Sequence, residues 1–345
     1  MTQAAQLAQY GANNVGLSFK NRIINGDMSI DQRNAGASIT PTVTTFPWQY
    51  NVDRWFTAQT QASRISIQQN AGGVTPPPGF TNYVGITSLG TTSLGANDVF
   101  LLQQRIEGFN TADFGWGTAN AQTVTLSFWV RSSLTGAFGG SFTNVADNRS
   151  YAFSYTINAA NTWEYKTITA PGDTTGTWQT TTAAGILVSF TCGIGSSLSG
   201  AANTWTAGLR LAPTGAVSLV GTNGATLYIT GVQFEKGSVA TSFDYLPYGT
   251  ELILCQRYFE LVSARFGGAA QSSAAASGTG IFVVEKRATP TITWISSTAS
   301  LNFPTTAPAG YSPVINTRYF TPFKIANGTS YDSRFDDLYS ASAEL

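Results

Sequence analysis

The densest group of side chains that could do chemistry lies in "FKNRIINGDMSIDQRNAGAS", residues 19–38. Carboxylates in such a stretch could hold a cation or act as acid and base, and nearby arginines could pair with them. Only 10% of the chain is charged, against roughly 25% in an average globular protein, so this density needs a reason. After eighteen uncharged residues, the stretch brings five charges: Lys20, Arg22, Asp27, Asp31 and Arg33.

Asn25, Gly26 and Asp27 permit two interpretations. One is a structural cation site, such as a Ca²⁺ site, built from Asp27, Asp31 and backbone carbonyls. The other is a turn at the end of a first strand, since Asn-Gly and Gly-Asp are common turn dipeptides. We favour the turn, and we expect no other cofactor.

The remaining charges near this stretch predict a salt-bridge network. Charge-poor β-proteins often place their few charges in buried pairs or at contacts between subunits. We therefore expect four residues to fix an N-terminal arm or a neighbouring subunit: Arg22, Arg33, Asp53 and Arg54.

Composition narrows the function further. The 345-residue chain has a formal net charge of zero and no basic patch, which argues against nucleic acid and acidic membranes as partners. Histidine is absent, so the commonest general base and metal ligand is missing. Catalysis would need two carboxylates about 5–10 Å apart. Candidates by residue type are Glu107, Asp113, Asp147, Glu164 and Asp173. No motif selects any of them, so we expect no enzyme.

Three other features are expected from the sequence. Cys192 and Cys255 are read as two buried thiols, because two distant cysteines do not indicate a disulfide framework. The sequence contains no run of about 18 apolar residues, so it predicts no transmembrane helix. The N-terminus lacks the basic region and apolar segment of a Sec signal peptide.

The elements that must position these residues are predicted to be strands. In "VTLSFWV", Val124, Leu126, Phe128 and Val130 alternate with polar residues and with Trp129. Similar alternation recurs at 64–69, 99–108, 151–157, 163–169, 185–191 and 226–234. Gly-, Pro- and Asn-rich turns separate these runs, and no sustained helical period is present. The predicted class is all-β: an antiparallel jelly-roll or β-sandwich body, then a smaller β-sandwich domain, with little helix.

Four segments are expected along the chain. They are an N-terminal attachment arm at 1–18, a jelly-roll body at 19–245, a junction with a short helix at 246–262, and a C-terminal β-domain at 263–345. Too short and weakly apolar to stand alone, the arm is expected to dock on a partner.

The junction and the C-terminal part carry more specific predictions. Thr250 is expected to N-cap a helix that ends near Cys255 or Arg257. Strands are predicted further along, at 281–286, 291–296 and 319–325.

Several motifs resemble bacteriophage structural proteins of the tail or tail-fibre type. They are "NRIINGDMSIDQRNAG" with "NVDRWF", "TVTLSFWVRSS", "GVQFEKGSVATSFDYLPYGTELILCQRYF" and the terminal "SASAEL". These anchors are spread over most of the chain, and the motif at 231–259 is the most specific. The resemblance implies a virion location, a homotrimer, and attachment to other phage tail or capsid proteins through residues 1–18.

"NRIINGDM" and "LYITGVQFEKG" are similar, more loosely, to the first and last strands of carbohydrate-binding jelly rolls. This similarity implies host cell-surface polysaccharide as a partner. In those modules a carboxylate on the closing strand usually helps to bind a cation. Here Thr230 and Gly231 occupy that stretch, so the pattern is broken and the cation site is weakened.

Sugar binding would use aromatic rings in loops, stacked against sugar faces. The loop aromatics chosen as candidates are Trp48, Tyr50, Phe114, Trp116 and Trp178. The alternative is that a β-sandwich with eight tryptophans simply buries them. Trp129 lies on the polar side of its strand, so we expect a neighbouring subunit or loop to cover it.

The function predicted from the sequence is a phage virion structural protein. We favour a tail fibre or receptor-binding protein that contacts host surface glycan without cleaving it. One alternative is a head decoration or capsid fibre protein. A second is a tail-borne glycan depolymerase, and a third is a secreted sugar-binding module.

Overall fold

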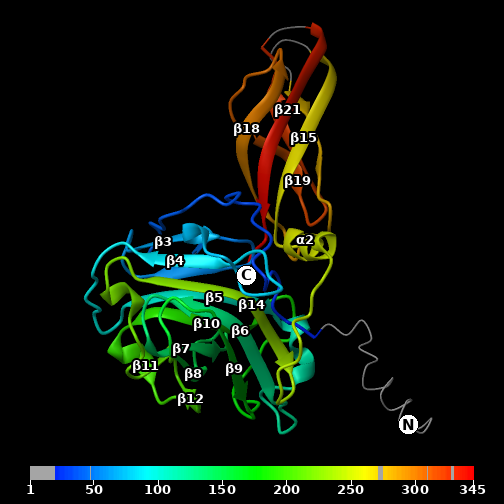
Figure 1. The fold of residues 1–345 in the computed structure, drawn as a ribbon. Coiled ribbons are helices and arrows are strands. Elements are labelled where there is room, and N and C mark those ends of the chain that lie inside the picture. The colour runs from blue at the N-terminus through cyan, green and yellow to red at the C-terminus, as the bar shows by residue number, and fades with distance from the viewer. Residues whose placement is uncertain (1–19, 47, 271–274, 309, 328–329) are drawn as a thin grey trace, which may run out of the picture.

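A computed structural model describes residues 20–46, 48–270, 275–308, 310–327 and 330–345. Figure 1 shows a broad β-sandwich, here called the body (residues 20–247), and a narrow projection that rises from it, here called the stalk (residues 259–342). The predicted arm at 1–18 lies outside the described residues.

The body is a sandwich of two antiparallel sheets. The larger sheet has, in spatial order, β1 (Gln49–Tyr50), β2 (Phe56–Gln59), β5 (Val99–Glu107), β10 (Ala184–Ile194), β7 (Gly136–Thr143), β8 (Arg149–Ile157) and β12 (Trp205–Ala207). The smaller sheet has β3 (Ile65–Gln69), β4 (Val84–Ser88), β14 (Thr226–Lys236), β6 (Val124–Ser132) and β9 (Glu164–Ala170). This architecture confirms the predicted all-β sandwich class.

Short elements connect the strands of the body. A parallel pair, β11 (Ser199–Gly200) with β13 (Ala212–Pro213), lies beside the larger sheet's β8 and β7. The 3₁₀ turns are η1 (Ala71–Gly73), η2 (Gly108–Asn110), η3 (Ala112–Phe114), η4 (Ser196–Leu198) and η5 (Leu219–Gly221).

Alternation along the strands builds the core between the two sheets. The four apolar residues of β6 named above are fully buried, while Trp129 is only partly buried on the opposite face. Apolar residues from both sheets join them in one large cluster, which includes Phe100, Phe142 and Phe234. Burying the apolar face of each sheet against the other is what stabilises this arrangement.

β7 was not predicted, because its sequence "GAFGGSFT" is rich in glycine. The structure shows why glycine is needed there. A Cβ atom at Gly140 would lie 2.0 Å from the Ser189 oxygen, and one at Gly139 would lie 2.2 Å from Pro213. Neighbouring segments of the same chain approach β7 too closely for any side chain at position 139 or 140.

The predicted first strand around residues 21–24 is wrong, because no regular strand forms there. The segment runs beside β14 through isolated backbone bonds instead. The Arg22 amide donates to the Phe234 carbonyl at 2.9 Å, and the Val232 amide donates to the Gly26 carbonyl at 2.9 Å. A tight turn follows, with Asn25 at φ 59°.

The α-helix of the described chain, α2 (Tyr248–Gln256), lies in the range predicted for the junction. The predicted cap is wrong. Pro247 occupies the N-cap position and no side chain caps the helix. The Thr250 amide donates to the Pro247 carbonyl at 2.8 Å, so Thr250 lies inside the first turn. Proline is favoured where a helix begins, because the first amides have no partner in the helix.

The stalk is a small sandwich with two sheets of its own. One sheet contains β15 (Phe259–Ala270), β21 (Ser330–Ser342) and β18 (Thr291–Leu301). The other contains β16 (Ala275–Ser277), β20 (Tyr319–Ile325), β17 (Gly280–Ile281) and β19 (Gly310–Ile315). The predicted strands at 291–296 and 319–325 are present. The one predicted at 281–286 is wrong beyond Ile281, because residues 282–286 form no strand.

The core of the stalk is small and contains buried charges. Lys324 and Asp337 form a fully buried ion pair with an Nζ–Oδ2 distance of 2.8 Å. Lys286 and Glu260 form a second pair at 3.0 Å, also buried. Rings such as Phe320 pack around them. Buried lysines of this kind need a carboxylate partner, because an unpaired buried charge is costly.

Candidate functional site

Three of the aromatic residues predicted to bind sugar are part of the core. Phe114, Trp116 and Trp178 are all buried. The Trp116 and Trp178 rings meet edge to face with centroids 4.8 Å apart, and Phe114 meets Phe234 at 5.7 Å. These three rings pack in the core cluster and leave no open ring face for stacking against a sugar.

Trp48 and Tyr50 are partly buried and engaged within the chain. Tyr50 stacks near Phe56, with ring centroids 5.1 Å apart, and its hydroxyl donates to the Leu345 carbonyl oxygen at 3.4 Å. Burial raises the pKa of Tyr50. Trp48 packs against the same apolar cluster. Neither ring is therefore an open stacking surface.

Asn25 organises the backbone around it. Its side-chain amide donates to the Ile30 carbonyl at 2.8 Å and the Asp53 carbonyl at 2.9 Å, and its oxygen accepts from the Ile30 amide at 2.9 Å. The side chain is fully buried. All these partners belong to the protein backbone, which fits the turn that we favoured.

The two carboxylates proposed for a cation site serve separate turns. Asp27 accepts from the Ser29 hydroxyl at 2.9 Å. Asp31 accepts from the backbone amides of Asn34 at 3.0 Å and Gly36 at 2.7 Å. No cluster of three or more potential metal-ligating residues exists in the part of the chain that the structure describes. The geometry therefore gives no support to the cation interpretation.

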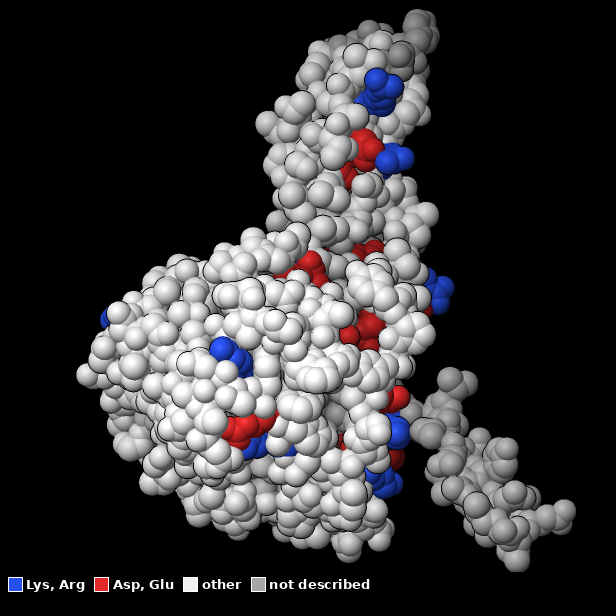
Figure 2. Space-filling view, viewed as in Figure 1, with Lys and Arg blue, Asp and Glu red and all other residues white. Residues whose placement is uncertain are grey.

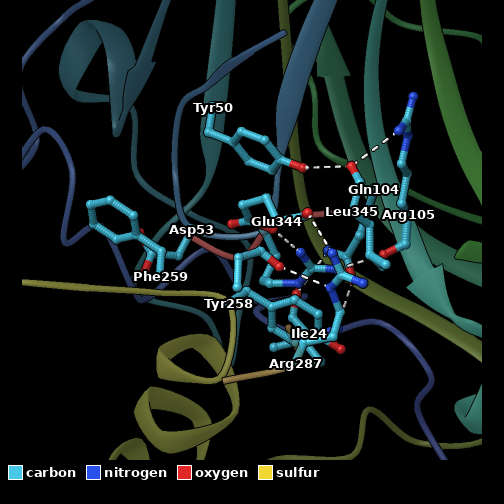
Figure 3. A network of polar contacts seen from close by, with 12 residues as sticks. Ile24, Tyr50, Asp53, Gln104, Arg105, Tyr258, Phe259, Arg287, Glu344 and Leu345 are labelled. Carbon is cyan, nitrogen blue, oxygen red and sulfur yellow. Dashed lines mark hydrogen bonds and ion pairs between the residues drawn. The ribbon is translucent and has the colours of Figure 1, made fainter. Parts of the chain in front are cut away.

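Two of the predicted interface charges, Arg33 and Arg54, bind a residue near this chain's own C-terminus. Arg33 pairs with Glu344 at 2.7 Å, and the buried Arg54 pairs with the other oxygen of the same carboxylate. Figure 3 shows Glu344 and Leu345 surrounded by side chains of the body and of the stalk base. The carboxylate partner of both arginines thus comes from residue 344 of the same chain. Contact of these charges with the arm or with a second subunit stays a prediction. We call this group the junction cluster: Arg33, Asp53, Arg54, Arg105 and Glu344.

Aromatic rings of the stalk base complete the junction cluster. The guanidinium of Arg54 lies 3.6 Å from the centre of the Tyr258 ring, and that of Arg33 lies 3.6 Å from the centre of the Phe259 ring. Such cation–π contacts strengthen when water is excluded. Asp53 accepts from Gln32, whose amide also donates to the Phe259 carbonyl at 3.0 Å. Burial raises the pKa of Asp53 to about 6, although Arg33 opposes the shift.

A second set of bonds joins the stalk base to β5. Arg257 pairs with Glu107 at 2.8 Å, and the Tyr258 hydroxyl donates to the same carboxylate at 2.7 Å. Arg287 donates to the backbone carbonyls of Ala343 and Glu344, each at 2.8 Å. The stalk is thus attached to the body through both of its chain ends.

Four of the five carboxylates considered for catalysis form ion pairs. Glu107 pairs with Arg257, as described above. Asp113 pairs with Arg22 at 3.0 Å, Glu164 with Lys166 at 2.6 Å, and Asp173 with Arg149 at 2.6 Å. For Asp147, burial raises the pKa. Arg22, the remaining predicted interface charge, therefore has its carboxylate partner inside the body.

An open groove lies on the outer face of the smaller sheet, within the part of the chain that the structure describes. It has a volume of about 260 Å³. Its lining comes from β6, β9, the β14 bulge and two flanking loops: Pro78, Phe80, Ser127, Trp129, Tyr165, Gly231, Thr241, Ser242, Phe243 and Tyr245. We call it the outer-face groove.

Two rings on neighbouring strands form its platform. Trp129 of β6 and Tyr165 of β9 are direct cross-strand partners, with ring centroids 5.5 Å apart. Tyr165 is 45% exposed, and Tyr245 on the facing loop is 55% exposed. Because paired strands fix both backbones, the two rings are held in place before any ligand arrives.

Gly231 opens the floor of the groove. It lies in the β14 bulge, between Thr230 and Gln233, with φ +61°. A Cβ atom there would lie 2.6 Å from the Phe80 ring. Phe80 in turn contacts Phe243 at 5.1 Å between ring centroids. Glycine at this position therefore lets the aromatic wall come close to the sheet.

Buried polar side chains hold the facing loop in place. Glu235 accepts from the Thr241 amide at 2.8 Å and from its hydroxyl at 2.7 Å. Gln233 accepts from the Asp244 amide at 2.8 Å. The Tyr245 hydroxyl donates to the Gly79 carbonyl at 2.9 Å, which links the two flanking loops. These hydrogen bonds within the chain therefore fix the shape of the groove.

Trp129 lines this groove, which two loops flank. Coverage of Trp129 by a neighbouring subunit stays a prediction. The sequence signal for this site was the alternation of apolar and polar residues along two strands. Trp129 lies on the polar side of "VTLSFWV" and Tyr165 on the exposed side of "WEYKTIT". Trp129 and Tyr165 come together because β6 pairs with β9. Neither segment's sequence shows that these two strands are neighbours.

Comparisons with known proteins give distant structural likenesses. No protein-family model matches the chain, and no curated protein matches it. A solved structure of the enzymatically active domain of bacteriophage CBA120 tailspike protein 4 is 12% identical over 63% of this chain, with a TM-score of 0.35. The match spans only 21% of that tailspike chain.

Two carbohydrate-binding modules are also similar in structure. TmCBM61, solved with β-1,4-galactotriose, is 10% identical over 63% of this chain and 99% of its own, with a TM-score of 0.31. The family 11 module from Clostridium thermocellum, solved with a mixed-linked tetrasaccharide, is 14% identical over 59% and 97%, with a TM-score of 0.28. TM-scores this low decide neither family nor ligand, so the residues of the groove must carry the functional argument.

Proposed function

We propose that this protein is a receptor-binding structural component of a phage virion, and that its outer-face groove binds a host surface polysaccharide without cleaving it. The observation that carries the proposal is the pair of partly exposed rings, Trp129 and Tyr165, fixed side by side on paired strands. The tail fibre is the location that we favour.

The rings suit a sugar because each pyranose ring has an apolar face of C–H groups. Such a face stacks on an aromatic ring, and the hydroxyls at its edge need polar partners. Hydroxyl-bearing residues, Ser127 and Ser242, line the groove beside the rings. Pockets for drug-sized ligands range over roughly 300–1,000 Å³. This smaller groove suits a short stretch of a longer chain.

Support for a virion location comes from the sequence motifs. The stretch at 21–36 and the long motif at 231–259 resemble phage tail proteins. In the structure both motifs lie beside the junction between body and stalk, since Asn25 contacts Glu251. We propose a homotrimer, and attachment to other phage proteins through residues 1–18, on the same resemblance.

Support for a non-catalytic role comes from the carboxylates. Four of the five residues considered for catalysis are held in ion pairs. No Asp or Glu lines the outer-face groove. A glycoside hydrolase would need two of them flanking the bond to be cut.

Binding to purified host polysaccharide, followed by calorimetry, tests the proposal. Tyr165→Ala should weaken binding about tenfold, because it removes half of the platform. Tyr248→Ala is the matched control: Tyr248 is 64% exposed on α2 and lies outside the groove. Equal loss in both variants, or in neither, contradicts the proposal. Release of new reducing ends from the polysaccharide would instead establish the depolymerase alternative.

A further inference from the structure

We infer that the outer-face groove selects uncharged sugars, neutral hexose or N-acetylhexosamine units, over sugars that carry carboxylate, phosphate or sulfate. The inference rests on the proposed function and goes further by naming the chemical class of the ligand. It is drawn from the charges in and around the groove.

The lining itself is neutral. Its ten residues include five with aromatic rings and three with aliphatic hydroxyl groups, and none is charged. An anionic sugar bound there would lose water from its charge and gain no cation in return. Burying a charge without a partner is costly, whereas a hydroxyl group needs only hydrogen bonds.

Carboxylate groups near the groove make its electrostatic environment negative. Glu235 lies directly behind Thr241 and is only 3% exposed. Asp244 sits between two lining residues, Phe243 and Tyr245. Burial raises the pKa of Tyr245, and the charge of Asp27 raises it further, which places that carboxylate within electrostatic reach of the groove. These three carboxylates would repel an anionic ligand.

Two cations lie close to the groove, and both already have partners within the chain. Lys20 donates to the Thr241 hydroxyl at 3.4 Å, beside the Glu235 carboxylate. Arg131 follows Trp129 on the same face of β6, but it donates to the Asn161 carbonyl at 3.0 Å. Its guanidinium also lies 5.4 Å from the centre of the Tyr228 ring. Neither side chain is a lining residue of the groove.

Paired probes that differ only in charge test this inference. The full-length protein is titrated with a host polysaccharide containing uronic acids, before and after chemical reduction of its carboxylates to alcohols. N-acetyllactosamine and its sialylated form give a second pair. We expect the neutral member of each pair to bind at least tenfold more tightly, with affinity almost unchanged between about 20 mM and 500 mM salt.

A gain-of-binding variant sharpens the test. Ser242→Lys places a cation in the exposed lining of the groove, and should raise affinity for the acidic members about tenfold. Ser238→Lys is the matched control, because Ser238 is exposed on the same loop but does not line the groove.

The outcomes separate the two proposals. Equal or tighter binding of the acidic members, mapped to the groove by the Tyr165→Ala variant, overturns the inference and leaves the proposed function standing. Absence of binding to every probe, neutral and acidic, overturns both. Equal gains from Ser242→Lys and Ser238→Lys would show that the charge of the groove lining does not set selectivity.

Discussion

The outer-face groove and the junction cluster use opposite chemistry. In the junction cluster, arginines and carboxylates are buried, paired and surrounded by rings that exclude water. In the groove, the rings themselves are partly exposed and the lining carries no charge. A chain with few charged residues thus places several of them where the body joins the stalk. Figure 2 shows that charges are sparse on the visible face of the body.

The comparison predicts that a junction variant loses stability and keeps its ligand. Glu344→Gln should lower the free energy of unfolding by about 3–5 kcal/mol, because it leaves the buried Arg54 without its charged partner. Urea unfolding measures the change, and calorimetry measures binding under native conditions. Glu285→Gln is the matched control: its pair with Arg318 is exposed, so stability should stay close to that of wild type. Equal effects of the two substitutions would contradict the role given to the junction cluster.

A groove variant should show the reverse pattern. Trp129→Ala should weaken polysaccharide binding by about 2 kcal/mol, roughly 30-fold, as expected for a central tryptophan in a binding site. Its unfolding transition should shift much less than that of Glu344→Gln, because Trp129 lies outside the main core cluster. Unchanged affinity in this variant would remove the groove from the proposal.

Gly231→Ala should affect both properties modestly. A non-glycine residue at φ +61° costs about 1–2 kcal/mol, and the new methyl group must also displace Phe80. Gly224→Ala separates the two effects, since Gly224 has φ +73° with nothing within 4 Å of an added Cβ. We expect similar destabilisation in both variants and weaker binding only in Gly231→Ala. Weakened binding in both would mean that the effect does not come from the groove floor.

The junction should also make stability depend on pH. The pKa of Glu251 is raised to about 7, mainly by burial and also by the charges of Asp27 and Asp244, while its bond from Asn25 opposes the shift. Since the ordinary value is 4.5, the folded state holds a proton that the unfolded chain releases between pH 4.5 and 7. Stability should therefore fall as pH rises through this window, by at most about 1.4 kcal/mol per pH unit for one proton. Denaturant unfolding from pH 5 to 8 measures it, and Glu251→Gln should flatten the slope.

The smallest effect is expected at Thr250. Its side chain does not cap α2, so Thr250→Ala should change the free energy of unfolding by less than about 0.5 kcal/mol. An N-cap threonine would instead cost about 1 kcal/mol when replaced by alanine. Urea unfolding distinguishes these values.

Strands with strong alternation could be predicted from the sequence, because each needs only its own residues to define a buried face. β6, β8 and β14 are examples. β7 could not be found, since its glycines are selected by neighbours such as Pro213 and Ser189 that lie far away in sequence. β15 and β21 were missed as well; β21 carries charges whose burial depends on the opposite sheet.

The candidate site was harder to predict than the fold. Whether Trp116 is buried depends on Trp178, which comes from another loop, and on Trp205 of β12. The pairing of Arg54 with Glu344 spans 290 residues and leaves no local pattern. Residue types correctly indicated where charge was concentrated, but the identity of each partner is decided by topology.

The two attachments of the stalk have a mechanical consequence. Phe259 at the start of β15 and Ser342 at the end of β21 pair with each other at the base, and each leads directly into side chains anchored in the body. A pull on the far end of the stalk would therefore be shared by β15 and β21, and each strand would carry tension along its backbone to the base. The body would receive this force at two attachment points and not at a single hinge. The stalk would therefore transmit force to the body without turning freely at its base.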